Sequence, residues 1–408
     1  MKNFDCVIVG GGMVGAASAL SLAQLGLKVA VVEVSHPKPF SPEQALDLRV
    51  SAISIASQHL LEQLEAWQQI LNWRSCPYER LGVWEQENAY TEFNAIDIDQ
   101  PHLGHIVENR LLQLSLWEQI ALQKNITLFC PEQLKSLTQT GEIVTCELTQ
   151  QTITTKVVIA ADGANSQLRN MVGIGITGWD YSQSAMLINV KTKLPQQDIT
   201  WQQFHKTGPV AFLPLPNTKS NDEPGESDFA GNGSLVWYHK KEEIKRLSAL
   251  SNEQLTKEIH QYFPDKLGTV NVLSKGSFPL TRRHANSYKK GRVLLLGDAA
   301  HTINPMAGQG VNLGFKDVKA LQTIIATAIS KGEQWDDEHV LARYEKMRRH
   351  DNLLMMTGMD ALYNSFSHPS SAVKSLRNLS LQALNKVPFI NSVVKNKALA
   401  YACGLKVL

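Results

Sequence analysis

The pattern of apolar and polar positions changes character three times along the chain. Short apolar runs alternate with helical spacings over residues 1–177, which predicts parallel strands joined by helices. Residues 178–286 instead alternate at every second position, as the strands of a half-buried sheet do. The pattern of short apolar runs and helical spacings returns at 287–335, and the apolar residues of 336–408 recur at helical spacing. We therefore expect an α/β fold in which a mixed-sheet domain, 178–286, is inserted into a Rossmann-like domain that ends in C-terminal helices.

The first strand–helix–strand unit carries a glycine motif. Phe4–Val9 has the pattern of a buried strand, and G-x-G-x-x-G follows at Gly10, Gly12 and Gly15. Gly10 permits a tight turn, Gly12 lets the backbone approach a pyrophosphate, and Gly15 lets helix and strand pack closely. The next strand ends at Glu33, where a carboxylate can accept a hydrogen bond from a ribose 2′-OH. Strand, glycines, helix, strand and acid in this register predict a dinucleotide-binding unit.

Two later apolar strands end in an acid beside a glycine. One leads into Asp162-Gly163 and the other into Gly297-Asp298. Ligands of an open parallel sheet bind at the carboxyl ends of its strands, so both pairs are candidates for the same crevice. An isolated Asp-Gly pair is more often a turn. Arg49, which follows the nucleotide unit, fits either a surface arginine or a contact to phosphate or flavin.

Composition and charge exclude several classes of function. A net charge of +2 gives no case for a nucleic-acid partner, and the twelve histidines lack the spacing of metal ligands. The five cysteines form no C-x-x-C pair, which fits reduced thiols in a cytosolic protein. We expect neither a signal peptide nor a membrane-spanning segment, because the chain starts at the first strand and has no run of 18 apolar residues.

The three motifs, with Pro305, Gly308, Gly310 and Asn312 in the form P-x-x-G-x-G-x-N, resemble the class A flavoprotein aromatic hydroxylases over nearly the whole chain. The runs DLRVSAISIAS, ADGANSQLR and GDAAHTINPMAGQGVNLGFKDV are similar to the ubiquinone-biosynthesis hydroxylases of that class. This resemblance implies an FAD-dependent monooxygenase that uses NAD(P)H and O₂. The stretches YSQSAMLINV and TWQQF favour the member that hydroxylates a 2-polyprenyl-3-methyl-6-methoxy-1,4-benzoquinol.

The resemblance also implies roles for individual residues. Glu33 would hold the adenosine ribose of FAD, and Asp298 would accept from its ribitol chain. The backbone of 308–310 would touch the flavin ring, at the positive N-terminus of the next helix. Asn109 stands where relatives often carry a flavin-contacting arginine or glutamine. The cofactor contacts expected in this way are Gly10, Gly12, Gly15, Glu33, Arg49, Asn109, Asp162, Gly163, Gly297, Asp298, Gly308, Gln309, Gly310 and Asn312.

Pro305, Gly308 and Gly310 are the expected catalytic positions, since they would border the oxygen-reaction side of the flavin. Asp162-Gly163 resembles a motif that serves both FAD and NAD(P)H. For the run 282–284, Arg-Arg-His, we expect ion pairing within the structure rather than a ligand contact. The resemblance supplies no nucleophile or triad, and none is required, because the chemistry belongs to the cofactor.

Several alternatives remain open in the sequence. A sister enzyme that hydroxylates another ring position fits the same motifs, as does an FAD-binding scaffold of the ubiquinone-synthesis assembly. The acid-free segment from Ser371 fits a solvated basic face or contact with an anionic membrane or a partner protein. The alternation over 81–87 and 90–96 predicts a hairpin, and that over 127–155 predicts a small antiparallel meander. The polar run Thr218–Gly233 is expected to be a surface loop. We expect a cytoplasmic protein, with peripheral contact at the inner membrane and self-association as open questions.

Overall fold

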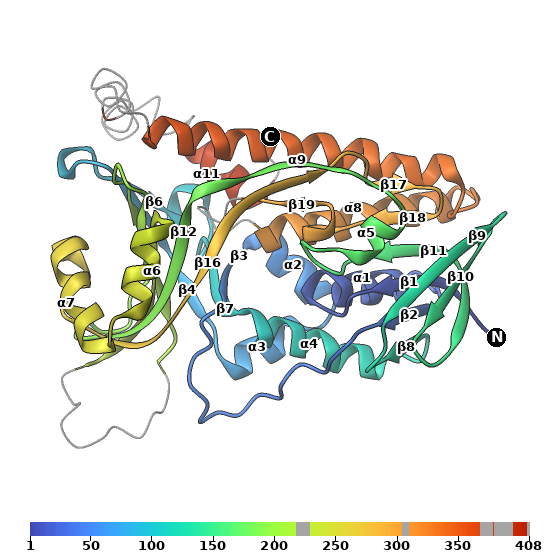
Figure 1. Ribbon diagram of the computed structural model, residues 1–408, viewed down its shortest axis with the longest axis horizontal. Helices are drawn as coiled ribbons and strands as arrows, with labels where there is room; N and C mark the ends of the chain where they lie inside the picture. Colours follow the sequence, from blue (N-terminus) through green and yellow to red (C-terminus); the bar gives the residue numbers. More distant parts are fainter. Residues whose placement is uncertain (218–228, 304–309, 368–377, 379–394, 406–408) are drawn as a thin grey trace.

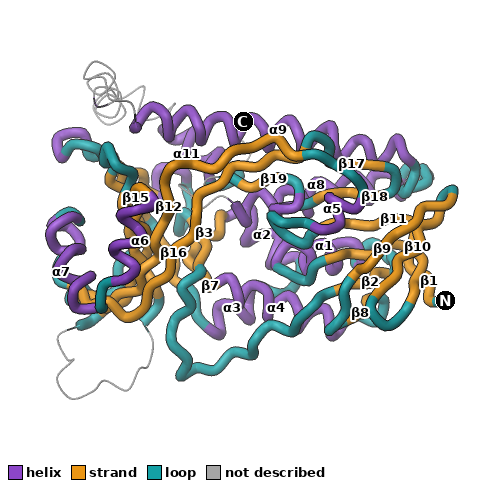
Figure 2. The backbone as a smooth tube through the Cα atoms, in the orientation of Figure 1, coloured by secondary structure: helices purple, strands orange, loops and turns teal. Residues whose placement is uncertain are grey.

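The computed structural model describes residues 1–217, 229–303, 310–367, 378 and 395–405. Pro305, Gly308 and Gln309 lie outside the described residues, as do 218–228 of the polar run and most of the basic segment after Ser371. Three sheets and their covering helices make up the described part (Figure 1, Figure 2). The mixed α/β class with C-terminal helices, predicted from the apolar pattern, is confirmed.

The first sheet is the dinucleotide-binding layer. Its strands follow the order β17-β18-β11-β1-β2-β8, and β18, β11, β1, β2 and β8 run parallel. An antiparallel pair, β9 and β10, extends β11. The strands are β1 (Lys2–Val9), β2 (Val29–Val32), β8 (Ile126–Phe129), β9 (Leu134–Thr140), β10 (Ile143–Leu148), β11 (Thr152–Ala160), β17 (Lys289–Lys290) and β18 (Val293–Leu295).

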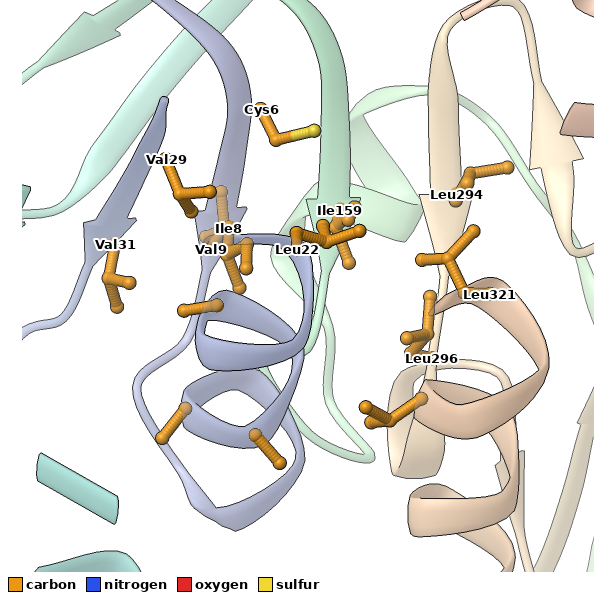
Figure 3. Close-up of a cluster of buried hydrophobic side chains, with 14 of the residues drawn as sticks. Cys6, Ile8, Val9, Leu22, Val29, Val31, Ile159, Leu294, Leu296 and Leu321 are labelled. Atoms are coloured by element: carbon orange, nitrogen blue, oxygen red, sulfur yellow. The ribbon is translucent and has the colours of Figure 1, made fainter. Parts of the chain in front are cut away.

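Helices α1 (Met13–Ala23) and α8 (Gly310–Ser330) pack side by side against this sheet. Figure 3 shows Leu22 of α1 and Leu321 of α8 beside the buried strand residues Ile8, Ile159 and Leu294. The apolar strand runs are buried because helices cover them, which is why they lack alternation. The other helices near this sheet are α2 (Ile55–Gln63), α3 (Trp67–Trp73), α4 (Asn109–Leu122), α5 (Gln167–Met171) and α9 (Glu338–Ser367).

The second sheet is mixed and follows the order β19-β16-β12-β15-β14-β13-β5-β6. Only the pair β13 and β5 is parallel among its described strands. The helices α6 (Lys241–Ala249) and α7 (Asn252–Tyr262) pack on one face. The strands are β5 (Arg80–Trp84), β6 (Thr91–Asn94), β12 (Ile176–Thr192), β13 (Ile199–Gln203), β14 (Val210–Leu215), β15 (Gly231–Lys240), β16 (Val270–Ala285) and β19 (His301–Thr302).

The pleat of the second sheet separates two sets of side chains. On β12, Met186 points into the core beneath α6 and α7, whereas its neighbours Ala185 and Leu187 belong to the opposite face. Trp237 and Tyr238 divide in the same way on β15. Successive strand residues face opposite sides of a sheet. One face is therefore structural, and the other is free to form a binding surface.

A small antiparallel sheet connects these layers. It consists of β3 (Val50–Ser54), β7 (Gly104–Glu108) and β4 (Cys76–Tyr78) in the order β3-β7-β4. The short helices are η1 (Glu87–Ala89), η2 (Ala95–Ile98), η3 (Asp265–Leu267), η4 (Gly297–Ala299) and α11 (Asn396–Ala402).

Two details differ from the pattern expected along the chain. We expected residues 127–155 to form one antiparallel meander, but β8 joins the parallel sheet beside β2. The hairpin β5–β6 lies within 1–177, yet it pairs with β13 of the second sheet. Both strands were recognisable from alternation, whereas their partners are far away in sequence. The domain boundaries at 177, 286 and 335 stay predictions.

A fully buried carboxylate joins four of these elements beneath the Gly297-Asp298 turn. Asp317 Oδ2 of α8 accepts from the backbone N–H of Gly297 (3.0 Å) and from His301 Nε2 (2.6 Å). Its Oδ1 accepts from Arg348 Nε (2.8 Å) and Asn352 Nδ2 (3.1 Å), both on α9. Burial alone would raise the pKa of this carboxyl, but His301 and Arg348 outweigh that effect and lower it to about 2. Asp317 therefore stays ionised and fixes the turn.

We predict that Asp317→Asn lowers the free energy of unfolding by about 3–5 kcal/mol, because it leaves the buried Arg348 without its main counter-charge. Chemical denaturation at neutral pH measures this. The matched control is Asp351→Asn, which removes the other carboxylate on Arg348, at a side chain that is 58 % exposed. That variant should lose only about 0–1 kcal/mol. Equal losses in the two variants would contradict the role of burial.

The same carboxylate predicts a pH dependence. Its folded-state pKa of about 2 lies below the ordinary value of 3.8, so its contribution to stability is complete above about pH 4 and disappears as the pH falls toward 2. Wild type should therefore lose more stability across that range than Asp317→Asn does. Parallel acid-unfolding curves for the two proteins would contradict this prediction.

Candidate active site

A cavity of about 1270 Å³ lies between the carboxyl edge of the first sheet and the free face of the second. The helices α1, α4 and α8 begin at its wall, after Gly12, at Asn109 and at Gly310 respectively. Free backbone N–H groups and the helix dipole make each N-terminus favourable for negative charge. The dinucleotide edge and the sheet-rich region thus meet in one space, and both acid–glycine turns contribute to its lining, as expected for a shared crevice.

The three glycines of the first motif have different reasons to be glycine. A Cβ on Gly10, whose φ is +102°, would lie 2.4 Å from the carbonyl oxygen of Ala161. A Cβ on Gly15 would lie 1.9 Å from the carbonyl oxygen of Gly10. At Gly12, no described atom lies within 4 Å of the corresponding point. Gly10 and Gly15 are therefore required by packing, whereas Gly12 borders free space that can admit a pyrophosphate.

Glu33 holds the glycine turn from the end of β2. Its Oε2 accepts from the backbone N–H of Gly11 (2.6 Å), and its Oε1 accepts from that of Val34 (2.9 Å). The carbonyl of Gly11 accepts from Gln113 Nε2 (2.9 Å) and Trp117 Nε1 (2.7 Å) of α4. Gln113 and Trp117 could not be predicted as contacts of Gly11. A polar atom at the end of a long side chain on an amphipathic helix leaves no pattern in the neighbouring sequence.

The Asp162-Gly163 turn is fastened to the Gly297-Asp298 turn by a buried arginine. Arg169 of α5 donates to the carbonyl of Ala299 (2.8 Å) and to that of Ala164 (3.2 Å). Asp162 Oδ2 accepts from the backbone N–H of Leu168 (3.1 Å), while its buried Oδ1 has no hydrogen-bond partner among the described residues. An orphaned buried acceptor fits a site whose ligand supplies the missing donor.

Three charged residues line the cavity within the described part of the chain: Arg49, Arg283 and Asp298. Burial raises the pKa of the Asp298 carboxyl, and His301 and Arg49 only partly offset this. Arg282, next to Arg283, points the other way and pairs with Asp360 at 2.6 Å, so the predicted ion pair is confirmed for this residue. Arg283 also has an ion-pair partner, since its guanidinium lies 3.9 Å from the Asp180 carboxylate, and it lines the cavity as well.

The two asparagines among the expected contacts occupy different places. Asn109 lines the cavity, and its Oδ1 accepts from Ser51 Oγ at 2.7 Å. Asn312 is buried beside β3, where its Nδ2 donates to the carbonyl of Ala52 (2.8 Å) and its Oδ1 accepts from the N–H of Ser54 (3.0 Å). The Asn312 side chain thus ties the start of α8 to β3 rather than lining the cavity.

The described lining residues include no histidine, and burial raises the pKa of the Cys403 thiol to about 11, so it is protonated at neutral pH. All five cysteines are free thiols. No cluster of three potential metal ligands occurs among the described residues. Their helices also include none with the length and apolar character that a membrane span needs.

Solved structures share this architecture. The p-nitrophenol 4-monooxygenase PnpA of Pseudomonas putida superposes with a TM-score of 0.79 at 20 % identity, covering 100 % of both chains. PqsL of Pseudomonas aeruginosa, a probable FAD-dependent monooxygenase, has a TM-score of 0.75 at 20 % identity, covering 93 % of this chain and 99 % of its own. At this identity the likeness establishes the fold alone.

Sequence relatives are more informative. The pattern of the FAD binding domain family matches residues 3–355. The chain is 44 % identical to the Escherichia coli 3-demethoxyubiquinol 3-hydroxylase over 402 residues, 98 % of each chain. It is 33 % identical to the ubiquinone hydroxylase UbiL of Rhodospirillum rubrum, covering 95 % of this chain and 87 % of that one. The human ubiquinone biosynthesis monooxygenase COQ6 is 29 % identical, over 98 % and 92 %. This chain belongs to the FAD-binding-domain monooxygenases, and within them to the ubiquinone-biosynthesis hydroxylase family.

Proposed function

We propose that the protein adds a hydroxyl group to the ring of a 2-polyprenyl-3-methyl-6-methoxy-1,4-benzoquinol, using FAD, NAD(P)H and O₂. The observation that carries this proposal is the 44 % identity, over nearly the full length of both chains, to an enzyme named for that ring position. The cavity supports it, because a dinucleotide edge and a largely apolar sheet face enclose the same space.

The site fits FAD on this chain's own geometry. Free space borders Gly12, the N-termini of α1, α4 and α8 reach the cavity, and Asp162 keeps an unpartnered acceptor. We propose that Glu33 holds the adenosine ribose, that the α1 N-terminus holds the pyrophosphate, and that Asp298 holds the ribitol chain. Bound FAD supplies the redox chemistry, taking electrons from NAD(P)H and activating O₂ for transfer of one oxygen atom to an aromatic ring.

The free face of the second sheet binds and orients the ring in this proposal. Leu187, Phe204 and Val236 supply an apolar surface that excludes water from the reacting atoms. Gln202 and Thr281 place polar groups on the same wall, where they can fix the orientation of the ring oxygens. A quinol ring already carries electron-donating oxygens, so the protein needs no dedicated base for the attack.

Two positive groups of the cavity lie outside the second sheet. The α8 N-terminus at Gly310 and the Arg49 guanidinium both favour negative charge on a ring placed beside them. We propose that 308–310 approach that ring through the backbone, and that Pro305 borders it. Contacts with other ubiquinone-synthesis proteins, with a membrane surface or with a second copy stay predictions, since most of the basic C-terminal segment lies outside the described residues.

Gly310→Ala tests the close approach. The nearest described atom to a Cβ at this position is Ile303 Cγ2 at 3.9 Å, so the described protein leaves room for a methyl group. We expect the hydroxylation rate to fall by roughly 10- to 100-fold, because a displacement of about 1 Å in the reacting groups can cost that much. Released H₂O₂ per NAD(P)H oxidised should rise.

The matched control is Gly358→Ala, an exposed position on α9 where an added Cβ also meets no described atom within 4 Å. It should keep wild-type coupling between NAD(P)H oxidation and hydroxylation. Wild-type coupling in Gly310→Ala as well would show that the backbone does not approach the reacting ring.

The metabolites of a deletion strain test the ring position. A strain that lacks this chain should accumulate the 3-demethoxy quinone, and both earlier ring hydroxylations should be retained. Mass spectrometry of the lipid extract measures this, with the strain complemented by the chain as the control. Accumulation of a polyprenylphenol or its 6-methoxy derivative would instead assign the chain to another ring position, as in a sister hydroxylase.

A further inference from the structure

The cavity extends beyond the ring site into an arm that no role described above uses. Six residues line this arm on the side away from the first sheet: Tyr78, Leu81, Phe93, Leu103, Leu399 and Ala402. They come from β4, β5, β6, the segment before β7, and α11. All of them except Ala402 belong to a separate apolar cluster that also contains Cys403. We call this part of the cavity the apolar arm.

The apolar arm begins beside the expected flavin site. Ser54 lines the cavity at the end of β3, and α2 starts at the next residue. The backbone N–H of Ala56 donates to the carbonyl of Cys403 at 3.1 Å, which fixes the end of α11 next to that point. A ligand that reaches Ser54 from the ring site can therefore continue between α11 and the strands.

The N-terminal end of α11 is fastened to η2. Asn396 Nδ2 donates to the carbonyl of Asp97 at 2.8 Å, and Lys395 Nζ lies 3.7 Å from the Asp97 carboxylate. Further along α11, Ala402 lines the cavity and is also exposed. The lining of the apolar arm therefore reaches the surface at Ala402.

A pair of stacked aromatic rings lies on the α9 side of the cavity. Phe366 of α9 stacks on Phe204, the residue that follows β13, with ring centroids 3.6 Å apart and planes 12° apart. Both rings line the cavity. An elongated ligand whose head lies against the second sheet therefore meets these rings toward α9 and the apolar arm toward α11.

The chemistry of the apolar arm selects the class of ligand. Its described lining holds no charged side chain, and its polar groups are the Tyr78 hydroxyl and the Cys403 thiol. Burial raises the pKa of both groups, so neither carries charge at neutral pH. A phosphate, sugar or peptide would lose its water there without gaining partners. A hydrocarbon chain loses no hydrogen bonds, and each buried CH₂ strengthens its binding by about fourfold.

We infer that the apolar arm binds the isoprenoid tail of the substrate and leads it toward the surface at Ala402 of α11. This inference rests on the proposed function for the identity of the ring. The whole cavity, at about 1270 Å³, exceeds the range of roughly 300–1000 Å³ usual for a single small ligand. A flavin, a quinol ring and the first part of a tail share that space.

Ala402→Trp tests the inference, because it places an indole inside the arm. The matched control is Ala398→Trp, the same change one turn earlier on α11, at an exposed residue outside the cavity lining. With a long-tailed quinol, Ala402→Trp should raise KM by about tenfold, equivalent to the loss of roughly two buried CH₂ groups. With a quinol that carries a methyl group in place of the tail, its KM should stay within about twofold of wild type.

Equal effects on both quinols, or equal effects of Ala402→Trp and Ala398→Trp, would overturn the tail site. A binding readout keeps this test separate from the proposed function. The oxidised quinone with a photoreactive diazirine at an early isoprene unit should label peptides from 76–104 and 395–405 of wild-type protein. Labelling confined to other regions, or none, would overturn the inference. Labelling of those peptides by a protein that hydroxylates neither quinol would support the tail site and refute the proposed reaction.

Discussion

The buried carboxylate of Asp317 is the interaction on which the site depends. It accepts the N–H of Gly297 on one oxygen and the guanidinium of Arg348 on the other, so one ionised group spans the turn, α8 and α9. An ionised carboxylate inside a protein is stable only when its hydrogen bonds and counter-charges are complete. The position of Asp298, one residue beyond Gly297, therefore follows from a network whose side chains lie outside the cavity lining.

In the rest of the site, too, side chains hydrogen-bond to the backbone of a turn and fix its position. Glu33, Gln113 and Trp117 anchor Gly11, and Arg169 joins the Asp162 turn to the Ala299 carbonyl. Backbone groups can thus face a ligand while buried side chains fix them. The second sheet contributes differently, because its pleat assigns alternate residues to the core beneath α6 and α7 or to the cavity.

The features of the site that depend on neighbouring residues could be predicted from the sequence. The glycine spacing, the acid at the end of β2 and the two later strand–turn pairs are read within short windows, since backbone conformation and burial leave local patterns. The residues that hydrogen-bond to these turns from distant parts of the chain could not be predicted in that way. Trp117 is 106 positions from Gly11, and Arg169 is 130 positions from Ala299. For the same reason β5 and β6 were seen as a hairpin but not as part of the second sheet, and the buried position of the Asn312 side chain was missed.

We propose that the protein transfers oxygen to a quinol ring bound in this cavity and is not merely a flavin-binding scaffold. Purified protein loaded with FAD and given NAD(P)H, the demethoxy quinol and ¹⁸O₂ tests it most directly. We predict a hydroxylated quinol that carries one ¹⁸O atom, formed in proportion to the NAD(P)H consumed. Oxidation of NAD(P)H to yield only H₂O₂, or a product that carries oxygen from water, would contradict the account.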